Sequence, residues 1–441
     1  MKKVLIISYY WPPSGGMCII RPLKLAKYLR KTGWEPVICT AKDPHYPFED
    51  QKGFLDVPDD MKIIKIPIIE PYVIYKAILG VKDKSVLADV IHNPTKASFL
   101  HKISVWIRGN FFIPDARSLW ISPVLKELTA FLRENPVDAI ITTGPPHSVN
   151  RIGYLLKKKF NLPWIADFQD PWTQVDYYDH FKISSWAHKR HRMMENQVFD
   201  NADLVTIVSE SWKTDLKSIG AKDVEVIPLG FDPQDFNAKI DLDIEFTITH
   251  LGLLGMDRQP FTFLKAIKEL CKENESFASH VRLQLVGNVN DTLKNEIIEL
   301  GLSSQVIYKG QIDRIKALEI MQSSHLLLLL LNKAPNVYGR IPGKFFEYLG
   351  SKRPILTLGP LFGTDLEKIL KKSSSGVYYD YDDLNMLKQY LTMQFDLFCS
   401  SGIKINKNQL QEEYSHLKIA DTFGSYLDKI IEKGKLNECN D

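Results

Sequence analysis

A lysine and a glutamate at helical spacing follow the most apolar segment of the chain. Pro342 suits the first turn of a helix that comes after a predicted buried strand, Leu326–Leu331. The unpaired backbone N–H groups near Gly343 and Lys344 then lie at a loop mouth, and a helix N-terminus that carries a lysine is suited to binding phosphate. Glu347 lies on the same face, where its carboxylate can accept hydrogen bonds from a ribose diol. An exposed Lys–Glu pair has the same spacing, so the residues alone leave both interpretations open.

A second cation follows another predicted strand of the same half of the chain. Arg258 stands where a Gly-containing loop meets the start of a helix at Pro260. A guanidinium there can hold a diphosphate through two parallel hydrogen bonds, although a solvated loop arginine is the simpler interpretation. Two cations at two strand-to-helix loops favour an anion site more strongly than either one alone.

The first half of the chain has small, polar and aromatic residues where its predicted strands end. Gly15 and Gly16 follow the first strand and leave room for a ligand beside the backbone, or form only a flexible turn. His147 follows another strand in a loop with two prolines, where it could contact a sugar hydroxyl or be ordinary polar surface. Another strand end carries two carboxylates and an indole, a combination that suits carbohydrate, although Asp170 is also placed to cap a turn. These residues are Asp167, Asp170 and Trp172.

Strands alternate with helical patterns along both halves, which predicts α/β architecture with two doubly wound, Rossmann-like domains facing a central cleft. The predicted strands of the first half are Val4–Ser8, Pro36–Thr40, Lys62–Ile66, Ala139–Thr143, Trp164–Asp167, Leu204–Val208 and Glu225–Pro228. Those of the second half are Thr247–Leu251, Arg282–Val286, Val306–Lys309, Leu326–Leu331 and Ile355–Leu358. The predicted domains are residues 1–235, with an irregular helical insertion at about 72–115, and residues 245–410. A C-terminal helix and tail, 411–441, is expected to lie across one domain or the other.

Composition excludes several classes of protein. The 441 residues include 56 Lys and Arg against 53 Asp and Glu, and a net charge of +3 gives no support for a nucleic-acid-binding protein. The five cysteines are scattered without a C-x-x-C pair, which argues against a disulfide scaffold or a cysteine–zinc cluster and favours a reducing compartment. The run Leu326–Leu331 is far shorter than the roughly 20 apolar residues of a membrane span. We therefore expect a cytoplasmic, soluble protein.

One basic stretch suggests contact with a membrane surface. Between Lys182 and Arg192 the chain carries further basic residues around Trp186, which is typical of a helix resting on anionic lipid. An ordinary exposed helix has the same composition and remains the alternative.

Five segments, in order along nearly the whole chain, resemble glycosyltransferases of family 4 (group 1 type), which have the GT-B fold. They are Tyr-Tyr-Trp-Pro-Pro-Ser-Gly-Gly at 9–16, Gly-Pro-Pro-His at 144–147, Asp-Phe-Gln-Asp-Pro-Trp at 167–172, Val-Ile-Pro-Leu-Gly-Phe-Asp at 226–232 and Pro-Gly-Lys-Phe-Phe-Glu-Tyr-Leu at 342–349. The resemblance implies retaining transfer of a hexosyl group from a UDP- or GDP-linked sugar to a glycan or lipid-linked acceptor. It further implies a role in bacterial surface polysaccharide biosynthesis, in the cytoplasm or peripherally at the inner face of the membrane.

The resemblance also implies residue roles. Arg258 and Lys344 would bind the diphosphate beside Gly343, and Glu347 would bind the ribose. His147 would contact the transferred sugar and, with the two cations, form the catalytic set. Gly16 would lie near the donor phosphates or the acceptor, and Gln311 and Ile312 near the base. The acceptor-side residues would be Gly15, Asp167, Asp170 and Trp172. No metal or other cofactor is expected, because cations and a helix terminus neutralise the leaving diphosphate. Two D-x-D strings, Asp241–Asp243 and Asp380–Asp382, are interpreted as solvent-facing.

Three positions depart from the family pattern. Gly339 stands where many relatives have a first glutamate that contacts the donor sugar, Gln259 replaces the usual lysine after Arg258, and Gln169 replaces an arginine. These departures leave the donor sugar unspecified. They also keep two alternatives open: a sugar-nucleotide epimerase of similar fold, and a non-catalytic nucleotide-sugar-binding protein.

Overall fold

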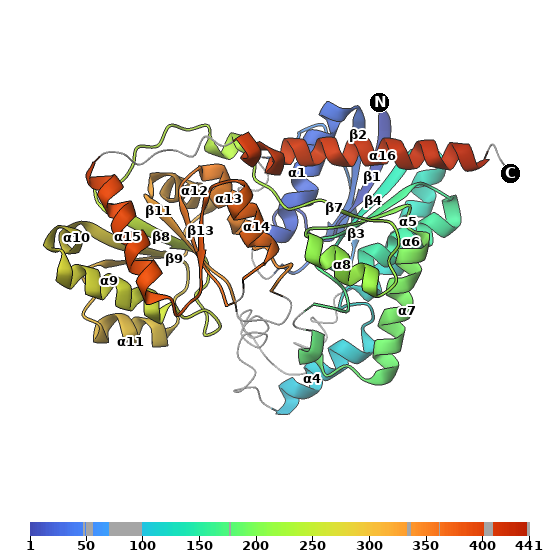
Figure 1. Cartoon of the computed structure of the whole chain (residues 1–441). Coiled ribbons are helices and arrows are strands. Elements are labelled where there is room, and N and C mark those ends of the chain that lie inside the picture. The colour runs from blue at the N-terminus through green and yellow to red at the C-terminus, as the bar shows by residue number, and fades with distance from the viewer. Residues whose placement is uncertain are drawn as a thin grey trace. The chain divides into compact units, whose positions relative to one another are not determined.

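The computed structural model describes residues 1–46, 49, 56–69, 99–175, 178–332, 337–360, 362–400 and 409–438. The chain separates into two compact units (Figure 1). The first unit combines Met1–Leu229 with the C-terminal segment His416–Asp441, and the second is Gly230–Ser415. Most of the expected insertion at 72–115 falls outside the described residues; its last part contains the helix α4, Phe99–Phe111.

The first unit is built on a seven-stranded, wholly parallel sheet in the order β3-β2-β1-β4-β5-β6-β7. Its strands are β1 Lys2–Ile7, β2 Trp34–Lys42, β3 Lys62–Pro67, β4 Ala139–Gly144, β5 Trp164–Phe168, β6 Leu204–Ile207 and β7 Val224–Val226. All seven predicted strands are confirmed to within two residues. The strand order reverses between β1 and β4, and ligands of such sheets bind at the carboxyl ends on either side of this point.

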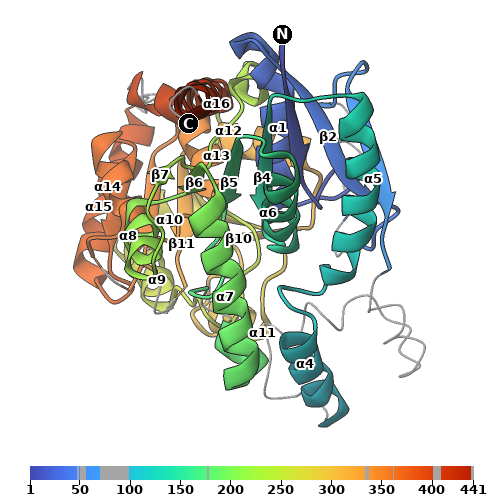
Figure 2. The same ribbon diagram turned by 90° about the vertical axis from the view of Figure 1, so that its right-hand side faces the viewer.

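Successive side chains of these strands serve two different cores because they alternate between the two faces of the sheet. In β1, Leu5 and Ile7 pack into one cluster while Val4 and Ile6 pack into the other. The first cluster lies under α5, α6, α7 and α8, and the second under α1 and α16 (Figure 2). The helices are α1 Ile20–Tyr28, α5 Ile121–Glu134, α6 Ser148–Phe160, α7 Ser185–Asn201, α8 Glu210–Ser218 and α16 His416–Glu438.

The last helix of the chain, α16, belongs to the first unit and packs along α1. Its apolar face is buried in the α1 core, where Phe423 and Leu427 are fully inaccessible to solvent. The Arg21 guanidinium lies over the Phe423 ring, and Asp428 accepts a hydrogen bond of 3.2 Å from the Trp34 indole.

The second unit contains a six-stranded parallel sheet in the order β10-β9-β8-β11-β12-β13. The strands are β8 Phe246–Leu251, β9 Val281–Val286, β10 Val306–Gly310, β11 Leu326–Leu330, β12 Ile355–Leu358 and β13 Gly376–Tyr379. The five strands predicted here are confirmed, and β13 was missed. This edge strand has only four residues and lacks the run of aliphatic side chains that marks a buried strand.

Helices cover both faces of the second sheet. They are α9 Phe261–Glu273, α10 Glu275–His280, α11 Asp291–Glu299, α12 Arg314–Ser323, α13 Gly343–Ser351, α14 Asp365–Lys372 and α15 Leu384–Cys399. The order of this sheet reverses between β8 and β11, so the carboxyl ends of these two strands mark its ligand-binding edge. Among the described residues, no helix is long and apolar enough to cross a membrane.

Candidate functional site

Lys344 lies where the strand order of the second unit reverses. The helix α13 begins at Gly343 with Pro342 as its N-cap, and Lys344 occupies its first turn. The Lys344 side chain reaches the neighbouring strand, where Nζ donates a 2.8 Å hydrogen bond to the carbonyl of Leu251, the last residue of β8. The predicted phosphate lysine is thus held at the sheet edge where ligands bind in doubly wound folds.

The surroundings of Lys344 disfavour its charged form in the absence of an anion. Burial and the nearby Arg258 guanidinium lower the pKa of Lys344 to about 7, while Glu347 and Asp257 oppose this shift. Gly252 has a φ of +119°, and a Cβ there would come within 2.8 Å of the lysine nitrogen. The backbone conformation therefore favours glycine at this position, and the missing side chain leaves room for the lysine nitrogen.

Arg258 lies within electrostatic range of Lys344. It lies on the loop after β8 and is paired with the neighbouring Asp257, at 3.1 Å from Nη2 to Oδ2. Asp257 was not among the predicted site residues. Its carboxylate offers the guanidinium a local partner that an incoming diphosphate can replace.

Glu347 is held by a residue that sequence reasoning missed. Nη1 of Arg314 lies 2.6 Å from Glu347, and its Nη2 lies 2.6 Å from Asp235, so one guanidinium joins two carboxylates from different elements. The alternative of an exposed Lys344–Glu347 pair does not hold, since each residue is engaged with another group. No local pattern identifies Arg314, because its two partners are 33 and 79 residues away in sequence.

Two buried rings support the end of β8 beneath Lys344. The Tyr348 hydroxyl accepts a 3.0 Å hydrogen bond from the Leu251 amide, and His250 Nδ1 lies 3.0 Å from the Leu328 carbonyl of β11. Burial, with a further contribution from Lys344, lowers the pKa of His250 well below its ordinary value, so this imidazole is neutral. These two contacts hold the end of β8, where the Leu251 carbonyl accepts the hydrogen bond from Lys344. Neither ring was predicted.

Gln311 and Ile312 follow β10, at the far side of this edge. Gln311 is exposed and Ile312 is half-buried. Backbone hydrogen bonds join the successive strand ends, from Gly252 N to Val286 O at 2.8 Å and from Gly287 N to Gly310 O at 2.7 Å. The loops after β8, β9 and β10 therefore form one continuous rim that runs from Lys344 towards Gln311.

The first unit places Gly16 and His147 after the two strands that flank its own reversal point. Gly16 follows β1, is exposed, has a φ of +88° and has open space where a Cβ would be. His147 follows β4, and its ring stacks on Trp172 with a centroid distance of 5.0 Å and an interplanar angle of 1°. The structure thus brings two predicted residues together, His147 from the β4 loop and Trp172 from the β5 loop.

His147 is a neutral ring in this setting. Burial lowers its pKa to about 3, and a hydrogen bond to the Pro171 backbone opposes this shift only in part. Nδ1 lies 3.3 Å from the side-chain amide of Asn150, and the Trp172 indole donates to Nδ1 of His191 at 3.0 Å. A neutral, oriented imidazole is suited to hydrogen bonding with a hydroxyl rather than to pairing with an anion.

Asp167 is placed in the core of the first unit. Its Oδ1 lies 2.7 Å from Arg21 Nη1 and accepts a 2.7 Å hydrogen bond from Thr206, and all three side chains are buried. Burial raises the pKa of Asp167, and Arg21 acts against that rise. The carboxylate is therefore engaged in joining α1 to the sheet. The other acceptor-side residues, Asp170 and Gly15, are half-buried at the strand-end loops.

The D-x-D strings form no metal site in the described part of the chain. No group of three or more His, Cys, Asp or Glu side chains is gathered there as metal ligands. Asp241 and Asp382 are exposed, Asp243 accepts a 3.1 Å hydrogen bond from Gln284, and Asp380 accepts one of 2.9 Å from the Asp382 amide.

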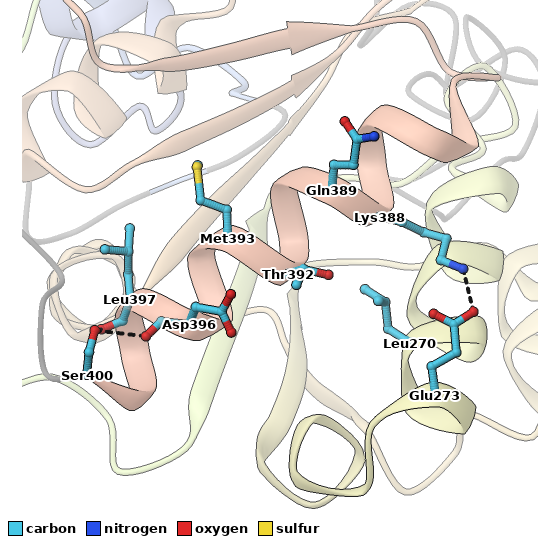
Figure 3. A pocket seen from close by; sticks show the side chains of 9 residues that line it. All are labelled: Leu270, Glu273, Lys388, Gln389, Thr392, Met393, Asp396, Leu397 and Ser400. Atoms are coloured by element: carbon cyan, nitrogen blue, oxygen red, sulfur yellow. Dashed lines mark hydrogen bonds and ion pairs between the residues drawn. The ribbon is translucent and has the colours of Figure 1, made fainter.

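A groove of about 620 Å³ lies on the second unit, away from all of these residues. Leu270 and Glu273 of α9 line one part of the groove, and successive side chains of α15 line the rest (Figure 3). Nζ of Lys388, on α15, forms ion pairs with the carboxylates of Glu269 and Glu273 on α9, at 2.9 and 2.6 Å. None of the predicted site residues lines this groove.

Comparisons with solved structures give similarity over the whole chain. HepE of Anabaena in complex with UDP matches with a TM-score of 0.62 and 14% identity, over 97% of this chain and 100% of that one. Sucrose-phosphate synthase of Thermosynechococcus elongatus matches with a TM-score of 0.61 and 15% identity, over 98% and 100%. Trehalose-6-phosphate synthase OtsA matches with a TM-score of 0.64 and 12% identity, over 97% and 99%. At these identities the similarity establishes the two-sheet GT-B fold.

The sequence itself matches one family. No curated protein sequence gives a match, whereas residues 23–235 match the family described as Glycosyltransferase Family 4. This region covers most of the first unit, with its reversal-point residue His147 and the His147–Trp172 stack. Residues 23–235 therefore form a glycosyltransferase family 4 domain, and the chain as a whole has the GT-B fold.

Proposed function

We propose that this glycosyltransferase moves a hexosyl group, with retention, from a UDP- or GDP-linked sugar to a glycan or lipid-linked acceptor in bacterial surface polysaccharide assembly. The single observation that carries the donor assignment is Lys344, fixed at the reversal point of the second sheet with Arg258 in electrostatic range. A similar structure, that of HepE, is a complex with UDP, which supports a nucleoside diphosphate as the ligand.

The two cations and the start of α13 would act on the leaving diphosphate. Negative charge grows on the diphosphate as the bond to the sugar breaks, and preorganised donors at that place lower the barrier. Lys344 becomes fully charged when the anion arrives, because an opposite charge raises the pKa that burial had lowered. We propose that this arrangement makes the reaction independent of metal.

The remaining donor contacts follow the rim of the second sheet. Glu347, oriented by Arg314, would accept hydrogen bonds from the ribose, while Gln311 and Ile312 would lie near the base. Gly343 would contribute its amide to the diphosphate. The order phosphate, ribose and base is consistent with the positions of these residues between α13 and the end of β10.

The first unit would hold the transferred sugar and the acceptor. The neutral His147, stacked on Trp172, would hydrogen-bond a sugar hydroxyl, and the open Gly16 would let the donor phosphates or acceptor approach the backbone. Gly15 and Asp170 would contact the acceptor. Asp167 would contribute by holding α1 through Arg21.

One experiment separates this proposal from its alternatives. The purified full-length protein is incubated with a panel of UDP- and GDP-sugars, with and without candidate glycan acceptors, and the products are analysed by mass spectrometry. Transfer, or slow hydrolysis to free sugar and nucleoside diphosphate, supports the proposal. An isomerised sugar nucleotide would instead establish an epimerase, and tight binding with no turnover a binding protein.

A further inference from the structure

The described side chains of the last turns of helix α4 leave large apolar groups in solvent. Gly109 and Asn110 are buried against the rest of the unit. Trp106 is 42% exposed, Ile107 40% and Phe111 64%. A helix stabilised only by its own unit would bury these side chains instead.

Tertiary contacts hold α4 in this orientation. The Asn110 side chain accepts a 2.7 Å hydrogen bond from the Ser184 amide, which fixes α4 beside the start of α7. At Gly109 any Cβ would come within 2.7 Å of the Phe181 side chain, so only a glycine permits this close approach. These contacts fix the orientation of α4, and in this orientation Trp106, Ile107 and Phe111 remain exposed.

The adjoining part of α7 adds positive charge and another exposed indole. Trp186 is 59% exposed, and the Arg190 guanidinium lies over its ring at 5.7 Å from the centroid. Lys189 is exposed beside them. Figure 2 shows α4 beside the end of α7 that carries these residues. We refer to Trp106, Ile107, Phe111, Trp186, Lys189 and Arg190 as the α4–α7 surface.

The sequences that form this surface have no negative charge. Neither Phe99–Phe111 nor the stretch from Lys182 to Arg192 contains an aspartate or glutamate. Exposed tryptophan and phenylalanine flanked by Lys and Arg, without acids, is the composition of helices that lie in the headgroup region of an anionic bilayer. A large apolar patch on a soluble protein marks an interaction site, and here the charge specifies the partner.

We propose that the α4–α7 surface docks the protein on a bilayer of anionic lipid. The aromatic side chains of α4 enter the headgroup boundary, and Lys189 and Arg190 lie against the lipid phosphates. This docking goes beyond the proposed transfer reaction. It requires neither donor nor acceptor, so it can be tested separately.

Binding of the full-length protein is measured by co-sedimentation with vesicles of phosphatidylcholine and phosphatidylglycerol in equal parts, and with vesicles of phosphatidylcholine alone. We expect binding to the mixed vesicles that weakens as salt is raised, and much weaker binding to the neutral ones. Removing both charges in Lys189→Gln/Arg190→Gln should weaken binding about 25-fold, or about fivefold for each basic residue. Trp106→Ala/Phe111→Ala should weaken it at least about tenfold, because the inserted apolar area is lost.

Matched variants control for general effects of charge and exposed apolar area. Lys217→Gln/Lys222→Gln removes two exposed charges from α8 and its following loop, and Ile298→Ala removes an exposed apolar side chain from α11. Both should bind like the unmodified protein, and circular dichroism verifies that every variant is folded. Equal binding by the Lys189→Gln/Arg190→Gln variant, or a dimer through this surface with no vesicle binding, would overturn the proposal.

Discussion

At the scale of single residues, the second unit holds the side chains of Lys344 and Arg258 close together, and burial with this proximity lowers the pKa of Lys344 before any anion arrives. Lys344 is fixed by the Leu251 carbonyl and Arg258 by Asp257, so neither side chain has to be ordered when a ligand binds. A bound diphosphate would raise the pKa of Lys344 and charge it. The free energy of binding would therefore include proton uptake by Lys344 as well as new hydrogen bonds.

Arg258→Ala and Lys344→Ala should each weaken the binding of UDP and GDP by about 1.5–3 kcal/mol, the contribution of a hydrogen bond to a charged group. Titration calorimetry measures the effect. Lys294→Ala is the matched control, since this exposed lysine of the same unit is paired with Asp291. If the Arg258→Ala/Lys344→Ala double variant bound either nucleotide as tightly as the unmodified protein, the diphosphate site would lie elsewhere.

The lowered pKa of Lys344 predicts proton uptake on ligand binding. At about pH 8 the lysine of the free protein is mostly neutral, since its pKa is about 7, and a bound diphosphate raises that pKa and charges it. The affinity for UDP should therefore fall as pH rises from 7 towards the ordinary lysine pKa of 10.5. Calorimetry in two buffers of different ionisation enthalpy measures the uptake, and Lys344→Met should abolish it. Constant binding enthalpy across the buffers for the unmodified protein would contradict the prediction.

At the scale of elements, buried and half-buried charged groups join segments that no local pattern connects. Arg314 of α12 links Glu347 of α13 to Asp235, and Arg21 of α1 links Asp167 of β5 to the carbonyls of Ile227 and Pro228. The sequence predicts the strands themselves, because an apolar run as short as Leu326–Leu331 has the length of a buried strand rather than of a buried helix. It does not predict these partners, because a charged side chain on a helix does not specify which distant carboxylate it meets.

Arg314→Ala should weaken UDP binding while leaving the binding of inorganic diphosphate nearly unchanged. The variant removes the partner that holds Glu347, the proposed ribose ligand, and it leaves Lys344 and Arg258 intact. The two ligands are compared by calorimetry. Arg314→Lys, which keeps the charge, should recover part of the affinity. An equal loss for both ligands would mean that Arg314 acts on the phosphates or on the fold.

Arg21→Met should destabilise the protein by about 3–5 kcal/mol, because it leaves a buried, unpaired carboxylate at Asp167. The Arg21→Met/Asp167→Leu double variant should recover much of that loss, since the unpaired charge is gone. Urea unfolding followed by circular dichroism gives the free energies. A large loss of acceptor affinity in the double variant, with its stability restored, would favour the acceptor role that the sequence suggested for Asp167.

At the scale of the whole molecule, the first unit is assembled from both ends of the chain. The sequence predicts a C-terminal helix and tail at 411–441, and in the structure this helix spans His416–Glu438. Its docking partner was not predictable, because an apolar face can cover any exposed core. Here the core is the α1 side of the first sheet, where Phe423 and Leu427 complete the layer.

Phe423→Ala should lower the stability of the first unit by about 3–5 kcal/mol, since it removes a fully buried ring and leaves a cavity. Thermal unfolding followed by calorimetry should show the transition of this unit moving to lower temperature. Met393→Ala of α15, half-exposed in the second unit, is the control and should shift neither transition. Unchanged unfolding of Phe423→Ala would mean that α16 adds little to the first unit.

The position of α16 after the second unit in sequence has a consequence during synthesis. The ribosome completes the seven-stranded sheet long before α16 exists, because the intervening Gly230–Ser415 must be translated first. At about 5–20 residues per second this takes roughly 10–40 s. Throughout that time the apolar side chains that α16 covers beside α1 remain exposed. This protein should therefore depend on chaperones until α16 leaves the exit tunnel.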